Sequence, residues 1–161
     1  MSNSLDETLS REVAKLINSK PSNCFENAYQ AALLTKGAVY VQGFLTFPGE
    51  PYAPVEYAWI EVGDSIIDPT LPYIKTNPQE LWYFAAQRLN VKKLKAIVDE
   101  SKEDYPEDDP LPIYGNAPYE YYGDVMLGDR EYLEAHQQAQ AKCLELNKPK
   151  IQQNSNGSVS S

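Results

Sequence analysis

The chain has 161 residues, of which 42% are hydrophobic, and this suits one ordinary domain with a single core rather than two independent domains. Its 23 acidic and 14 basic residues give a formal net charge of -9, a field that repels phosphate backbones and anionic headgroups and argues against nucleic-acid and membrane binding. One histidine and two distant cysteines make no metal-ligand spacing, so we expect neither a metal nor another cofactor.

The first predicted helix covers 4–18. Ser4 followed three residues later by Glu7 is a capping box, and the helix ends before Pro21 because the residue preceding a proline disfavours helical geometry. Helical spacing of apolar residues predicts its buried stripe: Leu5, Leu9, Val13, Leu16 and Ile17.

A second helix, "NCFENAYQAALL", is predicted to follow an N-cap at Asn23, with Glu26 at its third position. It runs to about Thr35, and Gly37 ends it. Cys24 therefore lies in the first turn of this helix.

Extended structure is predicted after that glycine. The segments 38–47 and 55–62 are rich in β-branched and aromatic residues, and the second alternates. Residues 63–64, Gly-Asp, form a two-residue turn into "SIID", which predicts an antiparallel hairpin from Val55 to Asp68.

A third helix is predicted from "NPQE", with Asn77 as the cap and Pro78 at the first position, and it runs at least through Leu89. The segment 91–100 either continues it or forms a separate element, with the basic cluster "KKLK" on a solvated helix face. The acidic, proline-punctuated segment 100–112 is predicted as a solvated loop.

The C-terminal part is predicted as a late strand, "YEYYGDVML", and a last helix from Asp129. Residues at helical spacing define the buried side of this helix: Tyr132, Ala135, Ala139, Cys143 and Leu146. The polar residues 149–161 are expected to form a disordered tail after a single domain over 1–148. Helices, antiparallel strands and further helices in this order predict an α+β fold.

Cys24 is the first candidate for chemistry. Free backbone N–H groups and the helix dipole at a helix N-terminus favour a thiolate, whereas the negative charge of Glu26 opposes it. On position alone, a small buried hydrophobe is an equally good interpretation of Cys24.

Four motifs extend this picture: "NCFENAYQAA", "YVQGF", "PVEYAWIEVGDSIIDPT" and "YYGDVM". Together they resemble a family of small bacterial and phage proteins of papain-like or transglutaminase-like fold, whose motifs read approximately C-x-x-N-A, Y-V-x-G, H-A-W, D-P-T and a later Y-x-G. The resemblance runs from Asn23 to about Met126. It implies that the cysteine-bearing helix packs on an antiparallel sheet.

Carried over to this chain, the family pattern implies that Cys24 is the nucleophile and Asp68 the acid that orients the base. The base position, a histidine in the family, falls on Tyr57. A phenol with an ordinary pKa near 10 is protonated at neutral pH and is a poor base. The resemblance therefore favours a protein that has lost the catalytic triad.

Further residues are candidate members of the site. His136 on the last helix is a possible replacement base, although a surface or core-edge position is the more ordinary interpretation, and Glu56 is expected to point to the strand face opposite Tyr57. The first backbone N–H groups of the Cys24 helix could form an oxyanion hole. The binding residues considered are Asn27, Tyr40, Trp59 and Tyr122, with a structural role preferred for Asn27 and a core position for Trp59.

Three functions remain open. We favour a catalytically degenerate cysteine-hydrolase-like protein that binds a protein, peptide or small ligand through the remnant cleft. The alternative is an active thiol hydrolase or acyltransferase that uses Cys24 and Asp68 with Tyr57 or His136 as an unusual base. A third possibility is a subunit or inhibitor whose acidic segment 99–112 engages a basic partner. With no signal peptide and no apolar stretch near the roughly 20 residues a bilayer requires, we expect a reduced, cytoplasmic protein.

Overall fold

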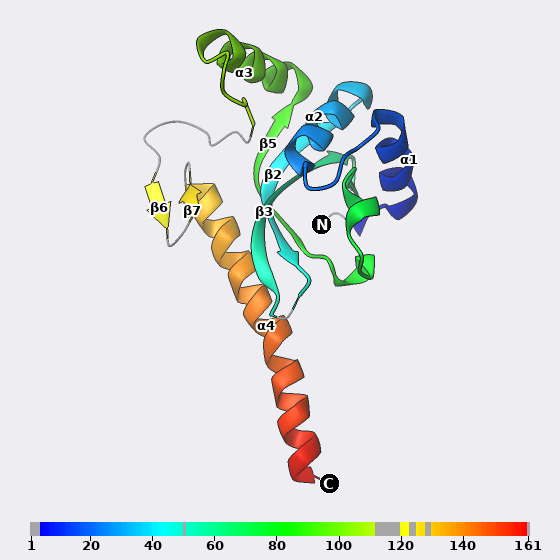
Figure 1. Cartoon of the computed structure of the whole chain (residues 1–161), viewed down its shortest axis with the longest axis vertical. Helices are drawn as coiled ribbons and strands as arrows, with labels where there is room; N and C mark the ends of the chain where they lie inside the picture. The colour runs from blue at the N-terminus through cyan, green and yellow to red at the C-terminus, as the bar shows by residue number, and fades with distance from the viewer. Residues whose placement is uncertain (1–3, 50, 112–119, 123–124, 128–129, 161) are drawn as a thin grey trace.

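A five-stranded mixed sheet forms the centre of the fold (Figure 1). The computed structural model describes residues 4–49, 51–111, 120–122, 125–127 and 130–160, with side chains over 4–49, 51–111 and 131–148. In the order β1-β4-β3-β2-β5, the strands are Ser4–Leu5, Ser65–Ile67, Ala53–Val62, Val39–Phe47 and Tyr83–Asn90. β1 is parallel to β4 and the other neighbours are antiparallel, which confirms the α+β class.

The first helix, α1 (Glu7–Ile17), begins later than predicted. Its cap is Asp6, whose carboxylate accepts the Leu9 amide at 2.9 Å, so the prediction of a Ser4 cap is wrong. Ser4 instead extends the sheet as part of β1, opposite Ser65. The buried side of α1 also differs from the predicted stripe, because Leu16 is exposed and the buried residues are Ser10, Val13 and Ala14.

The second helix and the hairpin are as predicted. α2 spans Cys24–Leu34, and the β3–β4 ladder pairs Ile60 with Ile67 and turns through Gly63, whose φ of 58° suits a glycine. β4 pairs only with Ile60–Val62 of β3. On that side, no other described strand pairs with Ala53–Trp59, so this part of β3 is an open edge.

The segment after "NPQE" corrects the third predicted helix. Asn77 does cap a turn, accepting the Gln79 amide at 3.0 Å, but this turn is only the 3-10 helix η2 (Pro78–Glu80). β5 follows where the helix was expected, because pairing with β2 outweighs the helical preference of its Ala, Gln and Arg residues. α3 (Val91–Asp104) is a separate helix, and it includes the first part of the predicted acidic loop.

The close approach of β5 to β2 explains why the "YVQGF" motif has a glycine at position 43. The β2–β5 register shifts between Gln42 and Gly43, so the two backbones come unusually close there. A Cβ atom at Gly43 would lie 2.1 Å from the Phe84 carbonyl oxygen and 2.9 Å from the Ala86 nitrogen. Only glycine fits this approach without moving β5.

The C-terminal part contains a small hairpin and a long helix. The predicted late strand is two short antiparallel strands, β6 (Glu120–Tyr122) and β7 (Val125–Leu127). α4 (Arg130–Ser160) packs its predicted face inward, with buried Tyr132, Ala135, Ala139 and Cys143. Its bounds include 149–160, the segment for which the sequence predicts a disordered tail. Figure 1 shows this last part extending beyond the rest of the molecule.

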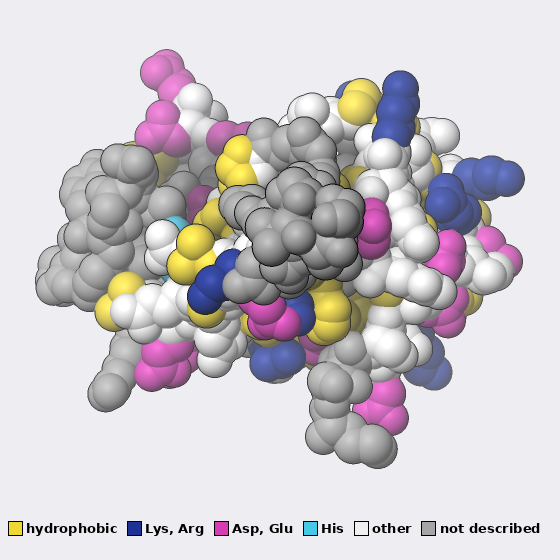
Figure 2. Space-filling view, turned by 90° about the horizontal axis from the view of Figure 1, so that it is seen from below, with side chains coloured by type: hydrophobic (Ala, Val, Ile, Leu, Met, Phe, Trp, Pro, Cys, Tyr) yellow, Lys and Arg dark blue, Asp and Glu magenta, His cyan; other side chains and the backbone are white. Residues whose placement is uncertain are grey.

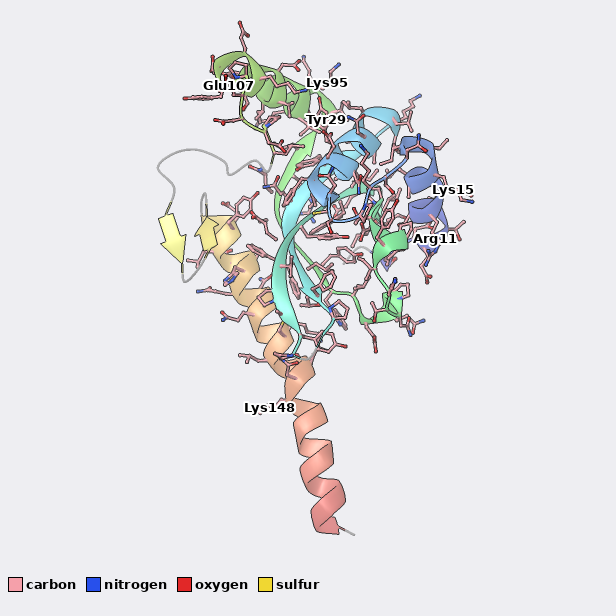
Figure 3. The ribbon with its side chains drawn as sticks, viewed as in Figure 1. Arg11, Lys15, Tyr29, Lys95, Glu107 and Lys148 are labelled. Atoms are coloured by element: carbon pink, nitrogen blue, oxygen red, sulfur yellow. The ribbon has the colours of Figure 1, made fainter. Side chains whose placement is uncertain are left out.

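The charged side chains spread over the surface. Acidic, basic and hydrophobic side chains intermingle on the face seen in Figure 2. Arg11 and Lys15 point outward from α1, and Lys95 belongs to the exposed basic cluster of α3, as predicted (Figure 3). Among the described residues, no helix combines the length and apolar character needed to cross a bilayer.

Candidate functional site

The candidate site is a pocket of about 380 Å³ where the N-terminus of α2 meets the open edge of β3. Cys24 opens α2, and Val55, Glu56 and Tyr57 come from the open edge. The pocket is completed by residues of neighbouring segments: Pro21, Ser22, Asn23, Phe25, Phe47, Thr70, Tyr73 and Ile74. Cys24 and Tyr57, predicted together as site residues, therefore share one cavity.

The Cys24 thiol is protonated at neutral pH. Burial raises its pKa to about 11, and the negative charge of Asp68 acts in the same direction. A backbone hydrogen bond from Ala58 and those at the start of α2 lower the pKa, but they do not offset the burial. The activation expected from the helix N-terminus is therefore outweighed at this half-buried position.

Asp68 is completely buried and fully hydrogen-bonded. Its carboxylate accepts the Tyr83 hydroxyl at 2.7 Å, the Tyr57 hydroxyl at 3.1 and 3.2 Å, and the Thr70 amide at 2.9 Å. Its own amide donates to the Ser10 hydroxyl at 2.9 Å. Burial raises the pKa of Asp68 to about 6, while these hydrogen bonds hold it below what burial alone would produce.

Tyr57 contacts Asp68, the acid that the resemblance pairs with the base position, from outside the β3–β4 ladder. The ladder pairs Ile60 with Ile67, so Tyr57 lies beyond its last pair and reaches Asp68 through its side chain. Burial and the charge of Asp68 raise the pKa of the Tyr57 phenol. Tyr57 thus donates a proton to a hydrogen bond where the resemblance implies a base.

Asn27 has the structural role that we preferred. Its amide nitrogen donates to the Lys20 carbonyl at 2.8 Å and to the Thr70 hydroxyl at 2.9 Å, and its amide oxygen accepts the Lys20 amide at 3.0 Å. These bonds fasten α2 to the segment before it and to the "DPT" segment. Asn27 itself is not among the residues that line the pocket.

Tyr40 and Trp59 lie in the core instead of the pocket. Both are completely buried; the Tyr40 hydroxyl donates to Gln42 at 2.8 Å, and the Trp59 indole donates to Glu61 at 3.4 Å. They are therefore not ligand contacts of this pocket. The side chain of Tyr122 lies outside the described residues.

His136 is not placed to serve Cys24. Its ring packs against Phe44, with the ring centroids 5.1 Å apart, and it does not line the Cys24 pocket. This is the core-edge position that a histidine beside an apolar stripe commonly takes.

Glu56 also lines the pocket, although the sequence predicts that it points away from the face of Tyr57. By alternation it lies on the strand face opposite Tyr57, yet both line the pocket because the pocket encloses the open edge of β3. Its Oε2 atom is buried and has no hydrogen-bond partner among the described residues, and burial raises the pKa of the carboxyl to about 7. The available signal was a charge on the same face as Ala58 and Ile60, which are both completely buried.

Comparisons with known proteins add no relative: no family model matches the chain, and neither curated proteins nor solved structures give a match. In the part of the chain that the structure describes, no three His, Cys, Asp or Glu side chains gather as a metal site.

Proposed function

We propose that this protein binds a small organic molecule or a peptide side chain in the Cys24 pocket and does not use the thiol for catalysis. The observation that carries the proposal is the geometry at the triad positions: the Tyr57 hydroxyl donates to Asp68, and burial at the start of α2 raises the pKa of Cys24. A degenerate relative of papain-like or transglutaminase-like proteins would have these properties.

The pocket has the composition of a ligand site. Its volume is at the lower end of the range for small-molecule pockets, roughly 300–1,000 Å³. Its walls are mainly apolar and aromatic, including Phe25, Phe47, Tyr73 and Ile74. A few polar groups, above all the Glu56 carboxylate, would orient the ligand.

An active thiol enzyme would need a base for the Cys24 proton. Glu56 is the only carboxylate among the described lining residues, and its pKa of about 7 lies well below the thiol pKa of about 11. Proton transfer from Cys24 to Glu56 is therefore unfavourable in the unliganded protein. This difference favours binding over catalysis.

The binding proposal is tested with a set of aromatic and aliphatic fragments, observed by chemical-shift changes in the labelled protein. We expect saturable shifts at Phe25, Tyr73 and Ile74 that disappear in Val55→Trp, which fills the pocket from a 40% exposed strand position. Gln79→Trp, at an exposed site outside the pocket, is the matched control and should retain them. Shifts that survive Val55→Trp, or no shifts with any fragment, would contradict the proposal.

The loss of the base is tested with Tyr57→His. If the scaffold is otherwise competent, this variant hydrolyses p-nitrophenyl acetate while the natural chain does not, and Tyr57→His with Cys24→Ala is inactive again. Hydrolysis by the natural chain that depends on Cys24 would favour the thiol-enzyme alternative instead.

A further inference from the structure

The charges of α3 oppose its own helix dipole. Lys92 and Lys93 lie in the first turn, where free backbone N–H groups already give a partial positive charge, and this turn has no acid. Glu103 and Asp104 lie in the last turn, where carbonyl groups give a partial negative charge. These four charges each destabilise the helix of a single copy, so helix stability does not explain their arrangement.

The helix itself does little to neutralise these charges. Lys93 and Glu100 are separated by about 10 Å along the helix axis, whereas side chains on one helix pair over three or four residues. The helical neighbours that follow Glu100 at that spacing are Glu103 and Asp104, which are acids as well. None of the ion pairs between described residues involves a side chain of α3. An opposite charge for Lys93 or Glu100 would therefore come from another molecule.

Opposite charges share one exposed face of α3, with Ala96 at its centre. Because each residue advances about 100° around a helix, Lys92 and Asp99 fall on one side of Ala96. Lys93 and Glu100 fall on the other side. All five residues are exposed, and the buried residues of α3 lie on the opposite side of the helix. Figure 1 shows α3 at one end of the molecule, far from the C-terminus of α4.

A face of this kind is complementary to itself. When two copies of one helix pack antiparallel about a two-fold axis, the N-terminal half of each lies against the C-terminal half of the other. With the axis beside Ala96, Lys92 lies opposite Asp99 of the second copy. Lys93 likewise lies opposite Glu100 of the second copy. The short side chain of Ala96 leaves room for the two helix axes to approach at this point.

We propose that the outer face of α3 forms a two-fold symmetric contact with α3 of a second copy of this chain. The helix is neutral although the chain has a formal net charge of -9, so general repulsion between copies is lower there. The structure describes all of α3, and none of its residues lines the Cys24 pocket, so the contact is independent of the proposed function. The lysines of α3 equal its acids in number: Lys92, Lys93, Lys95 and Lys102 against Asp99, Glu100, Glu103 and Asp104.

The contact is small, so the dimer should be weak and sensitive to salt. A helix of 14 residues is about 21 Å long, and one face of it buries less area than the roughly 1,200–2,000 Å² of a stable interface. Sedimentation equilibrium of the full chain, at concentrations up to about 1 mM, measures the association. We expect the association constant to fall at least about tenfold between about 0.1 M and 1 M NaCl, because the Debye length decreases from about 10 to 3 Å.

Charge-exchange variants assign the association to α3. Lys92→Glu with Lys93→Glu makes the four charged positions beside Ala96 all acidic, and Asp99→Lys with Glu100→Lys makes them all basic. Each double variant alone should associate at least about tenfold more weakly than the natural chain, and an equimolar mixture should regain association. Both double variants agree with the helix dipole, so thermal unfolding of the monomers should show no loss of stability.

Arg11→Glu with Lys75→Glu is the matched control for the acidic variant. It makes the same change in net charge at exposed positions outside α3 and should alter the association less than about twofold. A monomer at every concentration, an equal loss in this control, or a mixture that does not regain association would overturn the proposal. If the natural chain stays monomeric but binds octalysine, and Asp99→Lys with Glu100→Lys abolishes that binding, α3 serves a basic partner and the dimer is overturned.

Discussion

Two carboxylates lie at opposite sides of the Tyr57 backbone and show how differently this fold treats a buried acid. Asp68 accepts hydrogen bonds from two tyrosine hydroxyls and one amide, and it is completely buried. Glu56 is only partly buried as a residue, and its buried Oε2 atom has no hydrogen-bond partner among the described residues. Burial raises the pKa of both acids.

The difference separates an acid that fastens several segments together from one that lacks a hydrogen-bond partner. Asp68 is bonded to Ser10 of α1, Tyr57 of β3 and Tyr83 of β5. These hydrogen bonds fasten three elements to the segment that follows β4. Glu56 lacks a donor among the described residues, which costs stability. The position implied by the resemblance to be catalytic is therefore the structural one.

The largest expected effect comes from Asp68→Ala. It removes the acceptor of the Tyr57 and Tyr83 hydroxyls and of the Thr70 amide, and we expect the free energy of unfolding to fall by about 3–5 kcal/mol. Urea denaturation measures it. Glu56→Ala is the comparison and should cost less than about 1 kcal/mol; equal losses would remove the distinction between the two acids.

The thiol of Cys24 should react slowly. With a pKa raised to about 11, its thiolate fraction at pH 7.5 gives alkylation by iodoacetamide on the order of 100-fold slower than that of an ordinary cysteine. The rate should climb about tenfold per pH unit up to the pKa. Mass spectrometry distinguishes Cys24 from the buried Cys143. Rapid labelling of Cys24 at pH 7 would indicate an activated thiolate.

Tyr83→Phe should weaken the Asp68 cluster while keeping the aromatic contact with Trp59, whose ring centroid lies 5.1 Å away. Losing the 2.7 Å bond to an ionised carboxylate should cost about 1.5–3 kcal/mol at pH 8. Tyr57→Phe loses a longer bond and should cost less. Denaturation at pH 5, where Asp68 is mostly protonated, should give smaller losses for both; a loss independent of pH would contradict this account.

Glu56→Gln should have the smallest effect on stability, and a stabilising one. The folded-state pKa of about 7 exceeds the ordinary value of 4.5, so the folded protein holds the proton more tightly, and stability decreases as pH rises from about 4.5 to 7. Removing the charge should therefore raise the free energy of unfolding at pH 8 by about 1 kcal/mol, allowing for partial solvent screening, and change it little near pH 4. Thermal unfolding at both pH values measures the difference, and destabilisation at pH 8 would show that Glu56 has a partner.

Local signals explain which parts of the fold were predictable. The start of α2 after Asn23 and the hairpin turn at Gly63 are predicted from residues close in sequence, and both positions are confirmed, although the Asn23 side chain makes no capping hydrogen bond. β5 was missed because its residues favour a helix, and only the edge of β2 makes them a strand. No local pattern could reveal that edge.

The same reasoning applies to the candidate site. That Tyr57 and Asp68 lie near one another follows from the hairpin turn between them, but their hydrogen bond does not, because Tyr57 lies beyond the last pair of the β3–β4 ladder. The pKa of Cys24 was not predictable, because the burial that outweighs the helix N-terminus arises from distant segments. Glu56 was dismissed because strand alternation was applied without the knowledge that β4 is short.

Because β4 is short, part of β3 is an unpaired strand edge, and this affects the tendency of the protein to aggregate. An open strand edge offers backbone groups to a second chain and can start aggregation. Thr46, the partner of Pro54 in the β2–β3 ladder, donates its amide to Trp82, so the backbone nitrogen and oxygen of Pro54 point away from β2, toward the open side. Since proline has no N–H, that side lacks a donor where a foreign strand would need one, and the open edge beside the Cys24 pocket resists extension into a fibre.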